Sequence, residues 1–129
     1  MTPATFNKQE RLKRRKSIEA LFRTGRSFSS PPFRLLYRTP GETQPVPLRM
    51  TVAVPRRAIK RAVHRNLLKR RTREAYRMQN QELCKKLARR GEGLEILFLY
   101  QSTEIADFRT IRNSVRILLS RLSSETERR

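Results

Sequence analysis

The chain has 129 residues, enough for one domain with a modest core, and contains 31 Lys and Arg against 11 Asp and Glu. The formal net charge of +20 favours a polyanionic partner. No run of about 20 apolar residues could cross a bilayer, and no segment joins a cationic face to a broad apolar face, so nucleic acid is a better partner than a membrane. The one cysteine, Cys84, cannot form an intramolecular disulfide and fits a reducing cytoplasm.

The N-terminal part predicts a basic arm and a short helix. The arm is Arg11–Lys16 (RLKRRK), and Ser17 can cap the helix, which we expect to stop at Gly25. Three apolar residues share one side of this helix: Ile18, Leu21 and Phe22. At the two ends of the chain, residues 1–10 and 123–129 are expected to be flexible.

Two strands follow a break at Ser29–Pro32. The segment Pro32–Thr39 (PFRLLYRT) alternates as a strand does, and Leu48–Val54 (LRMTVAV) is a second strand that ends at Pro55. The loop between them, Pro40–Pro47, contains Pro, Gly and Thr and is expected to form the tip of a hairpin. In the first strand two sets of side chains point in opposite directions: Phe33, Leu35 and Tyr37 one way, and Arg34, Leu36 and Arg38 the other.

The most strongly charged stretch is Arg56–Arg77, with ten Lys and Arg and one acid, Glu74. At about 100° per residue, a helix here places six polar residues on one arc: Arg65, Asn66, Lys69, Arg70, Arg73 and Arg77. Four others lie on a neighbouring arc that can pack on a core: Leu68, Thr72, Ala75 and Tyr76. A solvated helix normally mixes both signs of charge, whereas these like charges repel one another unless a polyanion neutralises them. The stretch therefore predicts a helix that binds nucleic acid.

The C-terminal part predicts one strand and one helix. The basic helix can continue through Leu83 and Leu87 to a stop at Gly91–Gly93, after which Glu95–Tyr100 (EILFLY) is apolar enough to be a central strand. Asp107 can cap a last helix with six apolar residues at helical spacing: Phe108, Ile111, Val115, Leu118, Leu119 and Leu122. Together the elements predict a small α+β sandwich of one sheet with helices.

The chain lacks the residue clusters that an active site requires. Asp107 is the only aspartate and His64 the only histidine, and no pair of acids is spaced to hold two metal ions. Cys84 has no base partner nearby in the sequence, and the four glycines do not form a phosphate-binding loop. We therefore predict no catalytic residue and no metal ligand in this chain.

The pattern K-R-A-x-x-R-N-x-x-K-R-x-x-R-E, from Lys60 to Glu74, resembles the signature helix of the bacterial ribonuclease P protein subunit. The flanking segments resemble the same family in order and spacing from Arg11 to Leu122: RLKxxxxIxxLFRTG, FRLLYR, LRMTVAVPRR, GLEILFLYQS and IADFRTIRNSVRILLSRL. The resemblance implies a single RNA-binding domain with about four strands and three helices in the order α-β-β-β-α-β-α. It also implies a left-handed β-α-β crossover through the signature helix, which is exceptional.

Two binding surfaces are implied by the resemblance. One, on the signature region, contacts the catalytic RNA of the enzyme through Lys60, Arg61, Arg65, Asn66, Lys69, Arg70 and Arg73. The other is a cleft between the first helix and the sheet that holds the single-stranded 5′ leader of precursor tRNA, through Ile18, Phe22, Arg34, Leu36, Ala53 and Arg56, bordered by Asn66.

The residues themselves bear on the second surface. Leu36 shares its strand face with Arg34 and Arg38, which makes it poor core and a reasonable platform for RNA. Phe22 can stack on a base or pack in the core, and both interpretations stay open at this point.

The chain departs from the family pattern in three places. Ile18 stands where the family often has an aromatic residue, so that stacking there is replaced by aliphatic contact. Leu67 and Arg71 stand where the family often has Arg and Leu, which changes the side of the helix that packs and leaves open which edge faces RNA.

The implied function is assistance to RNA catalysis. By resemblance, an RNA subunit with bound Mg²⁺ hydrolyses the bond between leader and tRNA, and Mg²⁺ is held mainly by the RNA and the substrate. The implied partners are ribonuclease P RNA and precursor tRNA in the cytoplasm, without a membrane or an obligate protein partner. Two alternatives are a basic ribosomal or RNA-chaperone protein and a DNA-binding protein, although the basic helix has little of the Gln or Glu chemistry that reads bases in the major groove.

Overall fold

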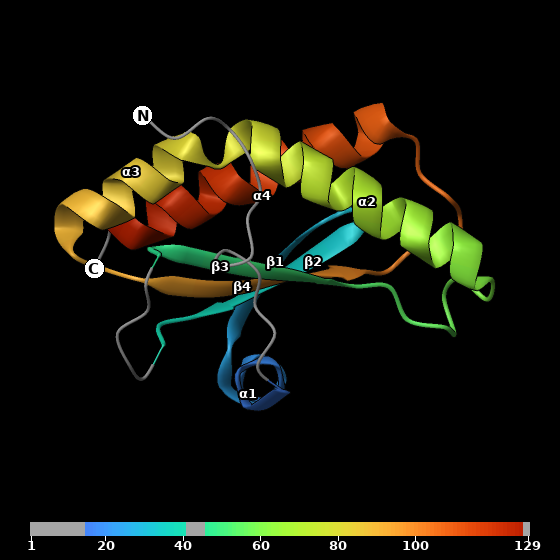
Figure 1. Cartoon of the computed structure of the whole chain (residues 1–129), viewed down its shortest axis with the longest axis horizontal. Coiled ribbons are helices and arrows are strands. Elements are labelled where there is room, and N and C mark those ends of the chain that lie inside the picture. Colours follow the sequence, from blue (N-terminus) through green and yellow to red (C-terminus); the bar gives the residue numbers. More distant parts are fainter. Residues whose placement is uncertain (1–14, 41–45, 128–129) are drawn as a thin grey trace.

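The computed structural model describes residues 15–40 and 46–127, which form four helices and four strands (Figure 1). In chain order these are α1 (Arg15–Thr24), β1 (Arg26–Ser30), β2 (Phe33–Arg38), β3 (Leu48–Ala53), α2 (Ala62–Gln79), α3 (Gln81–Arg90), β4 (Leu94–Tyr100) and α4 (Phe108–Glu127). The α+β class and the order of the predicted elements are confirmed, with one additional helix.

Helices stand at both ends of the described chain. Of the basic arm, Arg15 and Lys16 open α1 and the other residues lie outside the described part, as do residues 1–10. At the C-terminal end α4 continues to Glu127, and Thr126 is only 1% exposed and donates its hydroxyl to Leu122 O over 2.8 Å.

The four strands form one sheet in the order β1-β2-β4-β3, in which β3 and β4 are parallel and the other neighbours antiparallel. Strand β4 is buried along its whole length, as predicted for a central strand. Its one charged residue, Glu95, is 3% exposed and makes an ion pair of 2.7 Å with Arg38, its register partner on β2. The pair explains how an acid is accommodated in a buried strand.

Two strand predictions were wrong. Residues 40–47 do not form a hairpin tip, because β4 lies between β2 and β3 and pairs with both; residues 41–45 themselves lie outside the described part. The hairpin is instead formed by β1 and β2. Strand β1 occupies Arg26–Ser30 and overlaps the break predicted at Ser29–Pro32. Its RSFSS sequence carries little apolar signal because β1 is an edge strand with exposed side chains.

The connection from β3 to β4 runs through two helices. The single helix expected to reach Gly91 is interrupted at Asn80, where the backbone has φ −93° and ψ −6° and so leaves regular helical geometry. The bend lets Leu83 and Leu87 of α3 reach the same core as α2. The predicted stop is confirmed: Gly91 has a left-handed φ of 65° and donates its N–H to Ala88 O.

Helix α1 begins earlier than predicted and ends where predicted. Ser17 is not the cap, because the helix starts at Arg15 and Ser17 lies buried in its first turn. The N–H of Gly25 donates to Leu21 O over 3.1 Å, and a Cβ at Gly25 would lie 2.4 Å from that oxygen. Only glycine therefore allows the tight passage from α1 into β1.

Helices cover both faces of the sheet: Figure 1 shows α2, α3 and α4 on one face and α1 on the other. The larger core lies under the three helices and contains the four α2 residues predicted for packing: Leu68, Thr72, Ala75 and Tyr76. The smaller core lies under α1 and consists of Leu21, Leu36, Leu97 and Leu99, with Ile18 and Ala53 packed against it.

The interpretation of Leu36 as poor core was wrong. Its strand face does carry Arg34 and Arg38, but Leu21 of α1 packs on it, and Leu36 is 4% exposed. The alternation within β2 could not predict that Leu36 is covered, because the covering helix, α1, comes from a different part of the chain.

Truncation of Leu36 tests this small core. Leu36→Ala is expected to lower the free energy of unfolding by about 2–5 kcal/mol, because a buried leucine leaves a cavity. Urea unfolding of the isolated protein measures the change. Phe22→Ala is the control: Phe22 is 52% exposed, so its truncation should change stability by about 0.5 kcal/mol or less. Equal losses for the two variants would contradict the assignment.

Candidate nucleic-acid interface

The polar side of α2 is divided between exposed and partly covered groups. Asn66 and Arg70 are exposed, whereas Arg65, Lys69 and Arg73 are half-buried at the base of the same side. The neighbouring side of the helix is anchored in the larger core, so these groups are held in a fixed row along a rigid element. Such a row can follow the phosphates of a nucleic acid.

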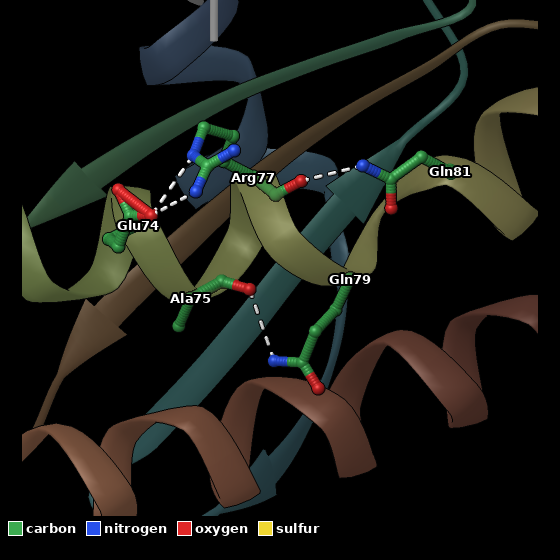
Figure 2. Close-up of polar contacts among 5 residues, drawn as sticks. All are labelled: Glu74, Ala75, Arg77, Gln79 and Gln81. Atoms are coloured by element: carbon green, nitrogen blue, oxygen red, sulfur yellow. Dashed lines mark hydrogen bonds and ion pairs between the residues drawn. The ribbon is translucent and has the colours of Figure 1, made fainter. Parts of the chain in front are cut away.

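The C-terminal end of this row is neutralised within the helix. Figure 2 shows Arg77 turned toward Glu74, and its Nε donates to Glu74 Oε1 over 3.0 Å. The hydrogen bond from Arg77 lowers the pKa of the Glu74 carboxyl, which therefore stays charged. Arg77, placed on the polar arc by its spacing, thus contributes less net charge to the surface than its neighbours.

Figure 2 also shows two further contacts at this end, in which Gln79 Nε2 donates to Ala75 O over 3.1 Å and Gln81 Nε2 to Arg77 O over 2.8 Å. They bind carbonyl groups of the last turns of α2 where the chain bends into α3.

Arg65 fixes the segment that enters α2. Its Nη1 donates to Ile59 O over 3.0 Å and to Lys60 O over 2.6 Å, so its guanidinium joins the preceding loop to the helix. Lys60 and Arg61 lie exposed in that loop. Arg61 is the residue before the first turn of α2, and its side chain makes no capping bond.

Leu67 and Arg71, the two departures from the family pattern within α2, lie away from the basic row. Arg71 and Lys69 are two residues apart and therefore about 200° apart around the helix. Arg71 Nη1 donates to Ala106 O over 2.7 Å and so binds α2 to the segment before α4. Leu67 is half-buried. The exchange of Leu and Arg thus affects the contact with α4 and leaves the basic row intact.

The second predicted surface lies where α1 crosses the sheet. Arg34, Leu99 and Ala53 are register partners on three adjacent strands, so they form one line across this face. Phe22 is 52% exposed, which favours a surface role over core packing. Arg34 is exposed and donates its Nη2 to Ser27 Oγ over 2.9 Å.

The structure brings together some of the proposed leader contacts and not others. Ile18, Leu36 and Ala53 meet in the small core, although Leu36 has almost no accessible surface there. Arg56 and Asn66 are exposed and lie outside this cluster, in the loop after β3 and in α2. They are connected to it by the chain, because Ala53 ends β3 and the loop leads directly into α2.

Residues with the chemistry of a metal or catalytic site do not gather in the described residues. Among residues 15–40 and 46–127 no group of three or more His, Cys, Asp or Glu could hold a metal ion. Asp107 caps α4 as predicted: its Oδ1 accepts the Thr110 N–H over 2.8 Å, and this hydrogen bond lowers the pKa of the carboxyl. No helix in the described part of the chain is both long and apolar enough to span a bilayer.

One set of charged residues was missed by the sequence reasoning. Helix α4 was identified by its apolar spacing alone, yet it also carries four exposed arginines, three of which follow one another at a spacing of three and four residues: Arg109, Arg112 and Arg116. The same helical periodicity that located the core face would have found them.

Comparisons with known proteins agree with this architecture. The sequence profile of the family Ribonuclease P matches residues 6–123. The ribonuclease P protein component of Porphyromonas gingivalis is 37% identical over 124 residues, which cover 95% of this chain and 90% of the relative. The solved structure of the RNase P protein from Thermotoga maritima is 28% identical, with a TM-score of 0.64 over 87% of this chain and 96% of that one.

A second solved structure supports the fold alone. The RNase P protein of Staphylococcus aureus is 20% identical and has a TM-score of 0.67 over 89% of this chain and 96% of that one. Since the family profile spans nearly the whole chain and the relative from Porphyromonas gingivalis matches over nearly its full length, the chain belongs to the ribonuclease P protein family.

Proposed function

We propose that this chain is the protein subunit of ribonuclease P, which binds the catalytic RNA and the 5′ leader of precursor tRNA in the cytoplasm and assists removal of that leader. One observation carries the proposal: α2 buries Leu68, Thr72, Ala75 and Tyr76 and leaves a row of basic groups on its other side. A helix held this way presents cations to phosphates without losing its own packing. Membership of the family supports ribonuclease P RNA as the partner of this row.

The leader-binding surface follows from the exposed groups beside α1. Phe22 offers a ring on which a base can stack, and Arg34 offers a guanidinium to the backbone. Leader recognition through these groups tolerates many sequences, because backbone charge and stacking carry little base information.

The chemistry is assigned to the RNA. The described residues are poor in clustered carboxylates, which are the ligands Mg²⁺ prefers in proteins, so these residues do not fit the role of metal holder. Mg²⁺ held by the RNA and the substrate would supply the metal-ion chemistry of the hydrolysis. The protein reduces repulsion between two polyanions and holds the leader so that the scissile bond is oriented.

Cleavage of precursor tRNA at low Mg²⁺ tests the proposal. A bacterial ribonuclease P RNA is expected to cleave faster with this protein than without it, because the protein screens the repulsion between RNA and substrate. The protein without RNA is expected to show no cleavage at any Mg²⁺ concentration. RNA binding without faster cleavage would instead fit a basic ribosomal or RNA-chaperone protein.

Substitutions along α2 test the contact with the catalytic RNA. Lys69→Ala, Arg70→Ala and Arg73→Ala should each weaken assembly and lower the slope of log affinity against log salt by about 0.7–0.9, the effect of one lost phosphate contact. Filter binding over a salt series gives the slope.

The matched control for this series is Lys85→Ala, which removes an exposed charge from α3. A slope that falls equally for this control would indicate bulk charge, and not the row on α2, as the origin of binding.

Phe22→Ala tests the leader surface. It should weaken holoenzyme binding of precursor tRNA by about 5- to 150-fold, the loss of one stacked base, and leave binding of mature tRNA unchanged. The reason is that only the precursor carries single-stranded nucleotides for the ring to contact. The measured quantity is the ratio of the two affinities.

Ile117→Ala serves as the control for this substitution, because Ile117 is also an exposed apolar residue on a helix, at 42%, but lies on α4. A ratio that stays at the wild-type value in Phe22→Ala would place the leader elsewhere.

A further inference from the structure

Helix α4 carries an exposed row of arginines apart from α2. Arg109, Arg112 and Arg116 are all exposed. With about 100° and 1.5 Å per residue, they fall within about 60° of the helix surface and extend over about 10 Å along its axis. We call these three residues the arginine stripe.

Arg121, the fourth arginine of α4, has a structural role. The Arg121 guanidinium carbon lies 4.5 Å from the centre of the Phe28 ring, and its Nη1 is 3.4 Å from Ser29 O, so the side chain packs against β1. Within the described part of the chain, Arg112 and Arg116 make no ion pair, and Arg109 is partly balanced by Asp107, whose pKa it helps to lower. Two of the three charges in the stripe are therefore uncompensated.

The stripe is separate from the basic row on α2. Arg71 Nη1 donates to Ala106 O, and Gln79 Nε2 donates to Arg112 O over 3.1 Å, so α4 lies against the turns of α2 that carry these two residues. Around the helix, Arg71 is about 200° and Gln79 about 80° from Lys69. Figure 1 shows α4 running beside α2 and α3 on the same face of the sheet. An RNA bound to the row on α2 does not by itself account for these cations.

A polar hollow of about 370 Å³ between α3 and α4 lies at the C-terminal end of the stripe. Its polar lining consists of Arg116, Gln79, Ser120, Ser123, Ser124 and Glu82. Lys86 Nζ donates to Ser123 Oγ over 2.9 Å, which leaves that hydroxyl its own hydrogen to donate. Serine hydroxyls and a guanidinium are suitable donors for phosphate oxygens, whereas the amide of Gln79 already donates to Ala75 O and Arg112 O. Glu82 opposes an anion there.

We propose that the arginine stripe and the adjoining hollow form a second RNA-binding surface, which contacts the phosphate backbone of a folded RNA. The inference rests on the proposed function, because it takes the RNA to be part of the ribonuclease P complex. The RNA is the catalytic RNA of that complex, and contact with the body of tRNA instead is an outcome that the tests distinguish.

The residue types on α4 support phosphate as the ligand. The stretch from residue 108 to 124 contains four arginines and no acid, whereas a helix side that only faces water normally mixes signs. Arginine presents a planar set of donors that matches a phosphate in two-point contact, and it does so better than lysine. Like charges one turn apart repel one another, and a polyanion removes this repulsion.

The first test removes the stripe. The triple variant Arg109→Gln, Arg112→Gln, Arg116→Gln should lower the salt slope of assembly with ribonuclease P RNA by about 2–3. Between 50 and 200 mM salt, the affinity advantage of the wild type over this variant should therefore shrink by about 15- to 60-fold. Circular dichroism melting checks that the variant remains folded.

The control removes the same number of charges from a neighbouring helix, α3. Arg112→Gln, Arg116→Gln is compared with Lys85→Gln, Arg89→Gln, which removes two exposed charges from α3. Only the α4 pair should change the slope. Glu82→Gln should have the opposite effect and tighten RNA binding, because it removes the one acid among the described residues that line the hollow. Unchanged affinity in Glu82→Gln would remove the hollow from the proposal.

Two arms distinguish the source of the phosphates. A changed slope with ribonuclease P RNA alone places the surface on the catalytic RNA. An unchanged slope there, with equal weakening of holoenzyme binding to precursor and mature tRNA, places it on the tRNA body. A hydroxyl-radical probe attached at Ser120→Cys in a Cys84→Ser background should cleave that same RNA.

Unchanged affinity for both RNAs, or equal losses in the α3 control, would overturn the inference. That result is separate from failure of the proposed function, which would appear as a wild-type protein that neither binds ribonuclease P RNA nor supports cleavage.

Discussion

Both hydrophobic cores depend on strand β4, which is buried along its whole length. Leu97 and Leu99 face α1 in the small core, and Ile96, Phe98 and Tyr100 face the layer of α2, α3 and α4. Because β4 pairs in parallel with β3, the chain between them has to cross over a face of the sheet. That crossing segment is α2 and α3, so the central strand determines where the basic helix lies. The position of the candidate RNA interface thus follows from strand pairing.

The arginines of this chain divide into those that hold the fold and those that remain at the surface. Arg38 neutralises the buried Glu95, Arg65 and Arg71 bind backbone carbonyl groups, and Arg121 packs on a ring. Each of these guanidinium groups has a fixed protein partner. Arg70 and Arg112 are exposed and project from helices whose other sides are buried. The positive charge is therefore not distributed evenly over the surface, and only part of it is available to a polyanion.

The sequence predicts best where the signal is local. The four buried positions of α2 and the stop at Gly91 follow from helical spacing and from the conformational freedom of glycine, and both are confirmed. Burial of Leu36 and the pairing order of the sheet depend on segments far apart in the chain, so alternation within one strand could not predict them. Edge strand β1 was not predicted, because its serine-rich sequence shows no alternation of apolar and polar residues. The basic row on α2 was predicted as a set, while the roles of Arg65 and Arg77 as internal partners required the structure.

The late position of β4 in the chain has a consequence for synthesis. Strands β2 and β3 cannot acquire their shared neighbour until residues 94–100 leave the ribosome, and by then the whole of α2 has already emerged. During that interval the apolar side of α2 has no completed sheet to pack on, while its cations are already exposed. A nascent chain in this state is surrounded by ribosomal and messenger RNA. The fold therefore closes in competition with non-specific binding to RNA. Pairing of β4 withdraws the apolar side of α2 from solvent, and parallel pairing between strands far apart in the chain is intrinsically slow.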